Sequence, residues 1–467
     1  MKHPTIPPRL GPAEALRRHF AQAAGLPFAD VLSAAQLQQV LTDCQVRFRD
    51  RVFAPLTTLA TFLTQVLDPD HSMRQAVARL IADRAARGLP ACSPDTRAYS
   101  KARQRLPEHL FAELTRRTGR DLLREAPARW CWRGRDVKVV DGTTLSMPDT
   151  PANQAAYPQI GSQRPGLGFP VVRLVALFSL AVGTVLDVAL GPWKGKHTGE
   201  PSLFRTLHHH LDAGDVLLAD RYYCGYVHLA LVRQRGADIV MRLHQRRHSD
   251  FRRGRRLGAG DHLVHWHKPK HRPEGIDADS FAQLPDTLAL REVRLRVPDS
   301  NSRCREIVVV TTLLDVHAYP KASLAELYRQ RWHAELDLRS LKTFLQLDIL
   351  RCHSPAMVRK EIWVHLLAYN LIRKVMAQAA QEHQLTPRQI SFKGALQTLN
   401  AFADRLRHCS GKELAALCRC LLAAVAQHRV GHRPGRLEPR AKKRRPKPYR
   451  LLNKPRDQAR KAEVGTG

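Results

Sequence analysis

Three acidic residues occupy positions from which they could bind metal ions. Asp141 ends the apolar run VKVVD, Asp220 ends the run DVLLAD, and Glu335 lies in a later helical segment. Acids placed just after buried strands are expected to meet in a crevice at the strand ends. Carboxylate oxygens are the ligands that Mg²⁺ prefers, and two such ions can clamp an in-line phosphoryl transfer. Any one of these acids alone is better explained by an ion pair with an arginine, but the set of three indicates metal-dependent chemistry on a phosphate.

The segment around Glu335 carries further groups that suit a phosphate substrate. An α-helix would place the side chains of four residues within an arc of about 60°, namely Tyr328, Arg331, Glu335 and Lys342. Their phenol, guanidinium and ammonium groups would then lie beside the carboxylate, where cations can hold phosphate oxygens. A solvated helix face can have the same composition, so this pattern adds to the three acids rather than standing alone.

A sheet and a long helix are needed to bring these side chains together. Apolar, β-branched runs predict strands over 136–147, 171–181, 184–190, 215–220 and 238–243. Helical patterns alternate with the later strands, which favours an α/β fold with a mixed sheet and flanking helices. A long helix is predicted from about Lys321 to Leu345. Asp141 and Asp220 are each expected to close a strand.

The same patterns divide the chain into six segments around this core. They are a helical N-terminal DNA-binding domain (1–128), the first part of the core (129–243), a β-rich insertion (244–304), the second part of the core with the long helix (305–350), a helical C-terminal region (351–428) and a basic, Pro-rich tail (429–467). The acids therefore come from two parts of the core that are far apart in the sequence.

The charge balance indicates a polyanionic partner. Lys and Arg total 76 against 42 Asp and Glu, a formal net charge of +34. From Arg429 to Glu463 there are 14 Lys and Arg against 3 acids, a net charge of +11. An excess of this size opposes compaction unless a partner neutralises it, and nucleic acid is the leading candidate.

A membrane partner is less consistent with the sequence. The most apolar window, Leu174–Leu186, is shorter than the roughly 20 residues that span a bilayer. The first residues lack the apolar stretch of a signal peptide. The nine cysteines include no C-x-x-C pair, which predicts reduced thiols rather than a disulfide framework. We therefore expect a cytoplasmic protein.

Four motifs together resemble one family of bacterial enzymes. The spacing Tyr328-x2-Arg331-x3-Glu335-x6-Lys342 is similar to the Y-R-E-K signature of insertion-sequence transposases of the insertion-sequence-four family. DGTTLSMPDT (141–150) and ADRYYCGY (219–226) resemble the two aspartate motifs of that family, and PRAKKRRPKPYRLL (439–452) resembles its C-terminal segment. The resemblance covers about residues 70–457.

This resemblance implies an RNase H-like catalytic core in which Asp141, Asp220 and Glu335 form a DDE triad. It implies two Mg²⁺ ions, with Mn²⁺ as a substitute, and cut-and-paste transposition in which a hairpin forms at the transposon end. The implied partners are double-stranded DNA (terminal inverted repeats and target) and a second copy of the chain in the DNA complex. In a bacterium, the protein would be associated with the nucleoid.

The resemblance also implies residues that hold DNA. Tyr328, Arg331 and Lys342 would hold the transposon end and an extruded nucleotide. In related enzymes, an aromatic residue of the insertion stacks on that base, and Trp266 is the residue here that could do so, although packing within a strand explains it more simply. The histidines of the insertion could bind zinc, but a DNA-facing surface fits their basic surroundings better. His208–His210 is expected on a helix surface.

Two alternative functions remain open from the sequence. One is a structure-specific nuclease with an RNase H-like fold, and the other is an inactive or domesticated transposase that only binds DNA. The presence of all three acids argues against loss of catalysis. The group of Tyr328, Arg331 and Lys342 argues against a generic nuclease, which does not need that set.

Overall fold

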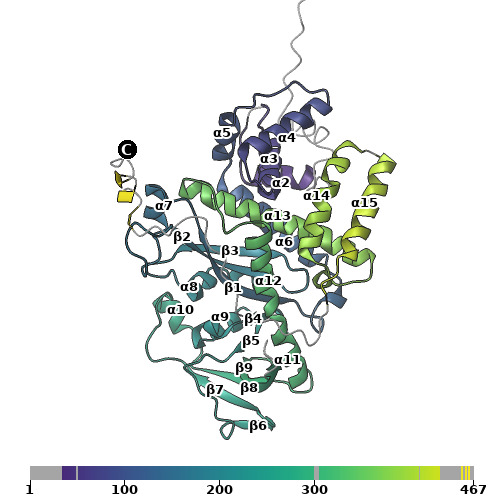
Figure 1. Cartoon of the computed structure of the whole chain (residues 1–467). Helices are drawn as coiled ribbons and strands as arrows, with labels where there is room; N and C mark the ends of the chain where they lie inside the picture. Colours follow the sequence, from purple (N-terminus) through teal and green to yellow (C-terminus); the bar gives the residue numbers. More distant parts are fainter. Residues whose placement is uncertain are drawn as a thin grey trace, which may run out of the picture. The chain divides into compact units, whose positions relative to one another are not determined.

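The structure, a computed structural model, describes residues 34–48, 51–298, 304–409 and 411–431, together with a few positions between 454 and 462. The chain contains two compact units, whose elements are labelled in Figure 1. One unit joins Met1–Glu125 with Arg359–Val430, and the other joins Ala126–Val358 with Gly431–Gly467. Most of the basic tail and the first 33 residues lie outside the described part.

A nine-stranded sheet forms the frame of the second unit, with the strand order β3-β2-β1-β4-β5-β9-β8-β7-β6. The five strands of its first half are β1 (Val137–Ser146), β2 (Val171–Ser179), β3 (Val185–Pro192), β4 (Val216–Ala219) and β5 (Asp238–Arg242). β1, β2 and β3 are antiparallel neighbours, whereas β4 and β5 run parallel to β1. This mixed order confirms the predicted α/β core and is that of an RNase H-like sheet.

The apolar runs of the sequence become strands because both faces of the sheet are covered. Every residue of β4 is buried, and all but one of β2. α8 (Glu200–Arg205) packs on β2 and β3, and α9 (Tyr226–Gln234) packs on β5. Strands buried on both faces are expected to read as continuous apolar stretches instead of alternating ones.

The β-rich insertion extends the same sheet (Figure 1). Its strands are β6 (Arg255–Gly258), β7 (Asp261–His267) and β8 (Thr287–Pro298), and they reach the core through β9 (Cys304–Thr311). β9 is antiparallel to both β8 and β5. On β8, the buried Arg291 donates from Nε and Nη2 to the two carboxylate oxygens of Asp261 on β7, at 2.8 and 2.6 Å. This bidentate ion pair joins two strands of the insertion.

The predicted long helix is divided into three pieces. α11 (Lys321–Gln330) is followed by α12 (Trp332–Arg339) and by the π-helical turn η4 (Ser340–Phe344). At the junction, the backbone N–H of Arg331 bonds to Tyr328 O and that of Ala334 bonds to Arg331 O. These three-residue bonds tighten the backbone at Arg331, whereas π turns widen it and are frequent at functional sites.

The first unit contains the N-terminal helices and the C-terminal helices. They are α2 (Ala34–Asp43), α3 (Pro55–Leu67), α4 (Met73–Ala86), α5 (Arg97–Arg105), α6 (Glu108–Arg124), α14 (Phe392–His408), α15 (Gly411–Gln427) and most of α13 (Pro355–Glu382). α13 is tied to α6 by the bond from Asn370 Nδ2 to Thr115 O, at 3.0 Å, and by the ion pair of Arg359 with Glu108. Among the helices of the described residues, none has both the length and the apolar character needed to cross a membrane.

Candidate active site

Asp141 lies inside a strand and not at its end, which differs from the prediction. β1 continues to Ser146 because residues 141–146 remain paired with β2. The parallel pairing of β1 with β4, however, stops at Val139. Asp141 therefore lies just beyond the point where the neighbouring strand ends. The N–H of Gly142 donates to Asp141 Oδ1 at 2.9 Å.

Asp220 directly follows β4, as predicted. The strand ends at Ala219, and Asp220 caps the 3₁₀ turn η3 (Arg221–Tyr223) by accepting a bond from Arg221 N at 2.7 Å. Because β4 runs parallel to β1, the carboxyl end of β4 lies at the same edge as Asp141.

Arg331 interacts with all three predicted acids. Its Nη2 donates to Glu335 Oε1 at 2.8 Å, one helical turn further on. Burial lowers the pKa of Arg331, but the bond to Glu335 and the charge of Asp220 outweigh this effect and raise the pKa above its ordinary value. The positive charge of Arg331 also acts on Asp141. Arg331 therefore contacts Glu335, and its charge also acts on Asp141 and Asp220.

The electrostatics around Asp141 suit a bound cation. Burial raises the pKa of Asp141 to about 6, and the negative charges of Glu335 and Glu200 add to this shift, whereas the Gly142 N–H and Arg331 oppose it. Ionising this carboxyl is therefore costly in the protein alone. A hard divalent cation would stabilise the ionised form, and the donors gathered here are the carboxylate oxygens that such cations prefer.

The other signature residues of the late helix lie around these acids. Tyr328 is buried, and its burial together with the charge of Asp220 raises the pKa of its phenol to about 12, so the phenol is neutral at ordinary pH. Lys342 belongs to the π turn, and its Nζ donates to Thr143 Oγ1 and Thr144 O, each at 3.2 Å. Lys342 thus contacts β1 just beyond Asp141.

Two further residues of this site were not predicted as site residues. Glu200 opens α8, and its carboxylate lies against Gly142. Tyr223 of η3 is buried, and its hydroxyl donates to Glu200 Oε2 at 3.4 Å. The sequence offered a weak signal for Glu200, since an acid at the start of a helix is common for electrostatic reasons alone. Tyr223 stands within the second aspartate motif and three residues after Asp220.

Trp266 has a packing role in this structure. It lies on β7 with only 6% of its surface exposed, its indole N–H donates to Glu292 Oε1 at 3.0 Å, and Arg247 Cζ lies 3.9 Å from the ring centroid. The ring therefore presents no open face on which a base could stack. Its neighbour His262 is also buried, and its Nε2 lies 3.1 Å from the other oxygen of Glu292.

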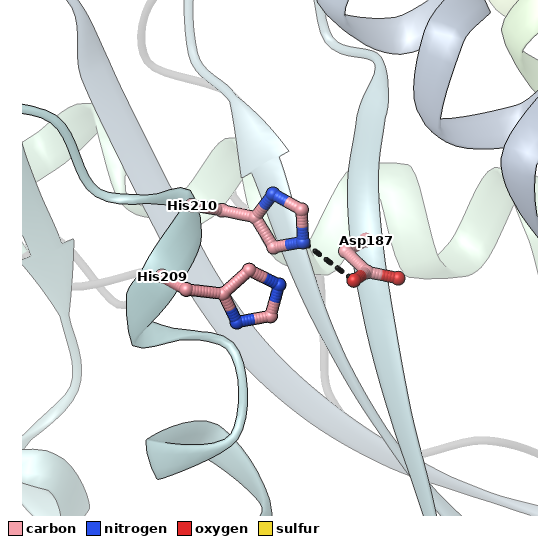
Figure 2. A group of neighbouring side chains, drawn as sticks. All are labelled: Asp187, His209 and His210. Atoms are coloured by element: carbon pink, nitrogen blue, oxygen red, sulfur yellow. Dashed lines mark hydrogen bonds and ion pairs between the residues drawn. The ribbon is translucent and has the colours of Figure 1, made fainter.

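A separate group of histidines and an acid lies elsewhere on the sheet (Figure 2). His210 Nε2 lies 2.6 Å from Asp187 Oδ2, and the ring of His209 is next to that of His210. Asp187 pairs with Leu177, which pairs with Val140, so Asp187 points to the opposite face of the sheet from Asp141. This group is therefore distinct from the acids around Arg331, and the hydrogen bond between His210 and Asp187 joins β3 to the 3₁₀ turn η2 (His208–His210).

Comparison with protein families gives a match across the core. Residues 132–371, slightly more than half of the chain, match the family described as the transposase DDE domain. The matched range contains Asp141, Asp220 and Glu335 together with Arg331. It begins just before β1 and ends within α13.

Individual relatives extend this match. Over 365 residues, the chain is 28% identical to the transposase InsG for insertion sequence element IS4 of Escherichia coli (strain K12), which covers 75% of this chain and 77% of that protein. A stretch of 69 residues is 36% identical to the transposase for insertion sequence element IS421 of Escherichia coli, covering 15% of this chain and 19% of that one. Among solved structures, the piggyBac transposase synaptic complex with hairpin DNA aligns with 10% identity and a TM-score of 0.40, over 89% of this chain and 84% of that one.

Proposed function

The chain belongs to the transposase DDE domain family, and from this premise we propose that it performs cut-and-paste transposition with Asp141, Asp220 and Glu335 as its catalytic triad. The family makes it a DNA transposase that uses divalent metal ions. The observation that supports the triad is that all three acids interact with the single guanidinium of Arg331. Residues from β1, the end of β4 and α12 are thereby gathered at one place.

The proposed metal ions are two Mg²⁺, with Mn²⁺ as a substitute. When bound, such ions would lower the pKa of a bound water and stabilise the charge that develops on the phosphate. Asp141, Asp220 and Glu335 would hold them through carboxylate oxygens. Glu335 has two carboxylate oxygens, so it could hold a metal ion while Oε1 keeps its bond to Arg331. The other N–H groups of Arg331 would be available to a phosphate oxygen of the DNA.

The proposed reaction has four successive phosphoryl transfers. Water attacks a phosphodiester at the transposon end, and the freed 3′ hydroxyl attacks the opposite strand to form a hairpin. A second water then opens the hairpin and frees the 3′ hydroxyl again, and this hydroxyl attacks a phosphodiester of the target DNA. Tyr328 and Lys342 would position the DNA strand with Arg331. The neutral phenol of Tyr328 can donate a hydrogen bond to a phosphate without repelling it.

The proposed partners are the terminal inverted repeats, the target DNA and a second copy of the chain that pairs two ends. The helical segment 1–128, the insertion and the tail 429–467 would supply further DNA contacts, in keeping with the net charge of +34. The protein would act at nucleoid DNA in the bacterial cytoplasm.

An end-cleavage assay with Mg²⁺ tests the triad. Glu335→Gln removes the charge but keeps the shape, so we expect cleavage to fall by at least about 10³-fold while binding to terminal-repeat DNA persists. The matched control is Glu326→Gln, which changes an exposed glutamate on α11 and should cut at the wild-type rate.

Three results of that assay would overturn the proposal. Wild-type cleavage by Glu335→Gln would remove Glu335 from the triad. Cleavage of unrelated DNA branches without joining of transposon ends to a target would indicate a structure-specific nuclease instead. Binding without cleavage by the wild-type protein would indicate an inactive DNA-binding relative.

A further inference from the structure

Glu200 is held at the edge of the site by a well-anchored short helix. α8 follows β3 and packs on β2 and β3 through Leu203 and Phe204, both of which are buried. Leu203 lies so close to the backbone of β3 that a Cβ at Gly191 would be 3.0 Å from its Cδ2. The position of Glu200 at the first turn of α8 is therefore fixed by packing on the core.

The carboxylate of Glu200 lies directly against the residue that follows Asp141. A Cβ at Gly142 would be 2.6 Å from Glu200 Cδ and 2.8 and 2.9 Å from its two oxygens. Gly142 lies within β1, paired with Val175, and its backbone is not in the left-handed region that favours glycine. The absence of a side chain at Gly142 is therefore what lets the carboxylate approach the strand.

Glu200 also contacts the element that carries Asp220. Tyr223, three residues after Asp220 in η3, donates its hydroxyl to Glu200 Oε2 at 3.4 Å. The phenol of Tyr223 is buried and senses the charges of both Glu200 and Asp141. Glu200 thus lies between the strand that carries Asp141 and the turn that begins at Asp220.

A purely structural role does not account for this position. An acid at a helix N-terminus is stabilised by the helix dipole, but α8 has only six residues and its dipole is correspondingly weak. Among the residues that the structure describes, no ion pair of Glu200 is found, while its charge does act on Asp141. Holding the Glu200 carboxylate where its charge acts on the Asp141 carboxyl is unfavourable unless a cation compensates for it.

We propose that Glu200 is a fourth carboxylate ligand for the divalent cations of this site. The inference rests on the proposed function, because it assigns to Glu200 the same ions that Asp141, Asp220 and Glu335 would hold. Mg²⁺ takes six oxygen ligands, so two ions leave ample room for one more carboxylate. Tyr223 would act as a positioning residue that orients the Glu200 carboxylate.

The test measures Mn²⁺ binding directly, by electron paramagnetic resonance on the full-length protein without DNA. Glu200→Gln should weaken Mn²⁺ binding by about 10-fold or more, and Glu200→Asp should weaken it less. Asp141→Asn serves as the reference for a triad ligand, and Glu326→Gln as the control that leaves binding unchanged. In the end-cleavage assay, Glu200→Gln should need correspondingly more Mg²⁺ to reach its maximal rate.

Gly142→Ala provides a second route to the same effect. The added methyl group would push the Glu200 carboxylate away from β1 without changing any acid, so Mn²⁺ binding should weaken. In a Glu200→Gln background, the same alanine should have little additional effect, because the two changes act on one interaction. If one of the two substitutions alone disturbs folding, comparison with the double variant separates that disturbance from the loss of the Glu200 carboxylate.

The outcomes separate this proposal from the function on which it rests. If Asp141→Asn loses Mn²⁺ affinity while Glu200→Gln and Gly142→Ala keep it, Glu200 is not a ligand and the triad stands. If Asp141→Asn also binds Mn²⁺ as the wild type does, the metal site itself is misassigned. Additive losses from Gly142→Ala and Glu200→Gln would show that the glycine acts otherwise than through Glu200.

Discussion

Arg331 neutralises a group of acids that would otherwise repel one another. Its guanidinium pairs with Glu335 and acts on Asp141 and Asp220, while Glu200 adds further negative charge to Asp141. A cation that is part of the protein can keep such a group folded before any metal binds. In the proposed function, the same guanidinium would bind a phosphate oxygen of the DNA beside the metal ions.

Removal of Arg331 should make the fold depend more strongly on metal. Without Mg²⁺, Arg331→Gln is expected to cost about 1 kcal/mol of unfolding free energy, a modest value because Glu335 is 38% exposed. Saturating Mg²⁺ should then raise the Tm of Arg331→Gln by more than it raises that of the wild type. Differential scanning fluorimetry measures both shifts.

The control for this prediction is Arg339→Gln, an exposed arginine at the end of α12. It should respond to Mg²⁺ as the wild type does. Equal Mg²⁺ shifts for Arg331→Gln and the wild type would mean that Arg331 does not compete with metal for the carboxylates.

At the scale of elements, histidines form a buried contact beside the site. His208 of η2 and His228 of α9 are each 6% exposed and pack around Phe204 of α8, which differs from the surface location expected for His208. Burial, with the charge of Arg205, lowers the pKa of His208 to about 3, and burial lowers the pKa of His228 well below its ordinary value. Both imidazoles are therefore neutral in the folded protein at neutral pH.

These two histidines should make the fold sensitive to mild acid. Their pKa values are lower in the folded than in the unfolded state, so the unfolded chain binds more protons below pH 6.5, and stability falls as the pH falls. Each histidine should contribute about 1.4 kcal/mol per pH unit between pH 6 and the pKa of the folded state. Between pH 6 and 5, the unfolding free energy of His208→Phe should therefore fall by about 1.4 kcal/mol less than that of the wild type.

Urea unfolding at several pH values measures this slope. The control is His248→Phe, which replaces an exposed histidine of the same unit and should leave the slope as it is in the wild type. An unchanged slope in His208→Phe would show that His208 can be protonated in the folded protein.

At the scale of the whole molecule, the chain combines a large excess of positive charge with a small group of acids at the candidate site. The chain has 76 Lys and Arg against 42 acids, and the charge of Arg331 acts on three of those acids. The tail from Arg429 carries a net charge of +11 up to Glu463, although most of it lies outside the described residues. Such a balance suits a protein that holds DNA over a wide surface and cuts it at one place.

Deletion of residues 436–467 should weaken DNA binding and reduce its salt dependence. Each phosphate contact that is lost lowers the slope of log K against log [salt] by about 0.9. Fluorescence anisotropy with terminal-repeat DNA at several salt concentrations measures this slope. A Gly/Ser segment of the same length in place of the tail is the control for chain length, and a slope equal to that of the full chain would show that the tail does not contact DNA.

The local sequence was sufficient to predict the strands of the core and to place Asp220 and Glu335 on their elements. The triad was implied by the family resemblance and stays a prediction. Apolar, β-branched runs such as VKVV and VLLA predict buried strands, and the spacing from Tyr328 to Lys342 follows the helical period. Asp220 and Glu335 lie on elements that such regular patterns define, so the prediction of those elements also gave the positions of these two residues. The α/β core with a mixed sheet followed from the order of those elements.

The tertiary structure decided the features that depend on pairing between distant segments. β1 continues past Asp141 because β2 pairs with it. The insertion joins the main sheet because β9 pairs with both β5 and β8. Trp266 is buried because Glu292 and Arg247 enclose it. The Glu200 carboxylate lies against β1 at Gly142 because α8 packs on β2 and β3, and because Gly142 has no side chain. Periodicity along a chain carries information about neighbours within one element, whereas these contacts join residues whose separation in the sequence follows no period.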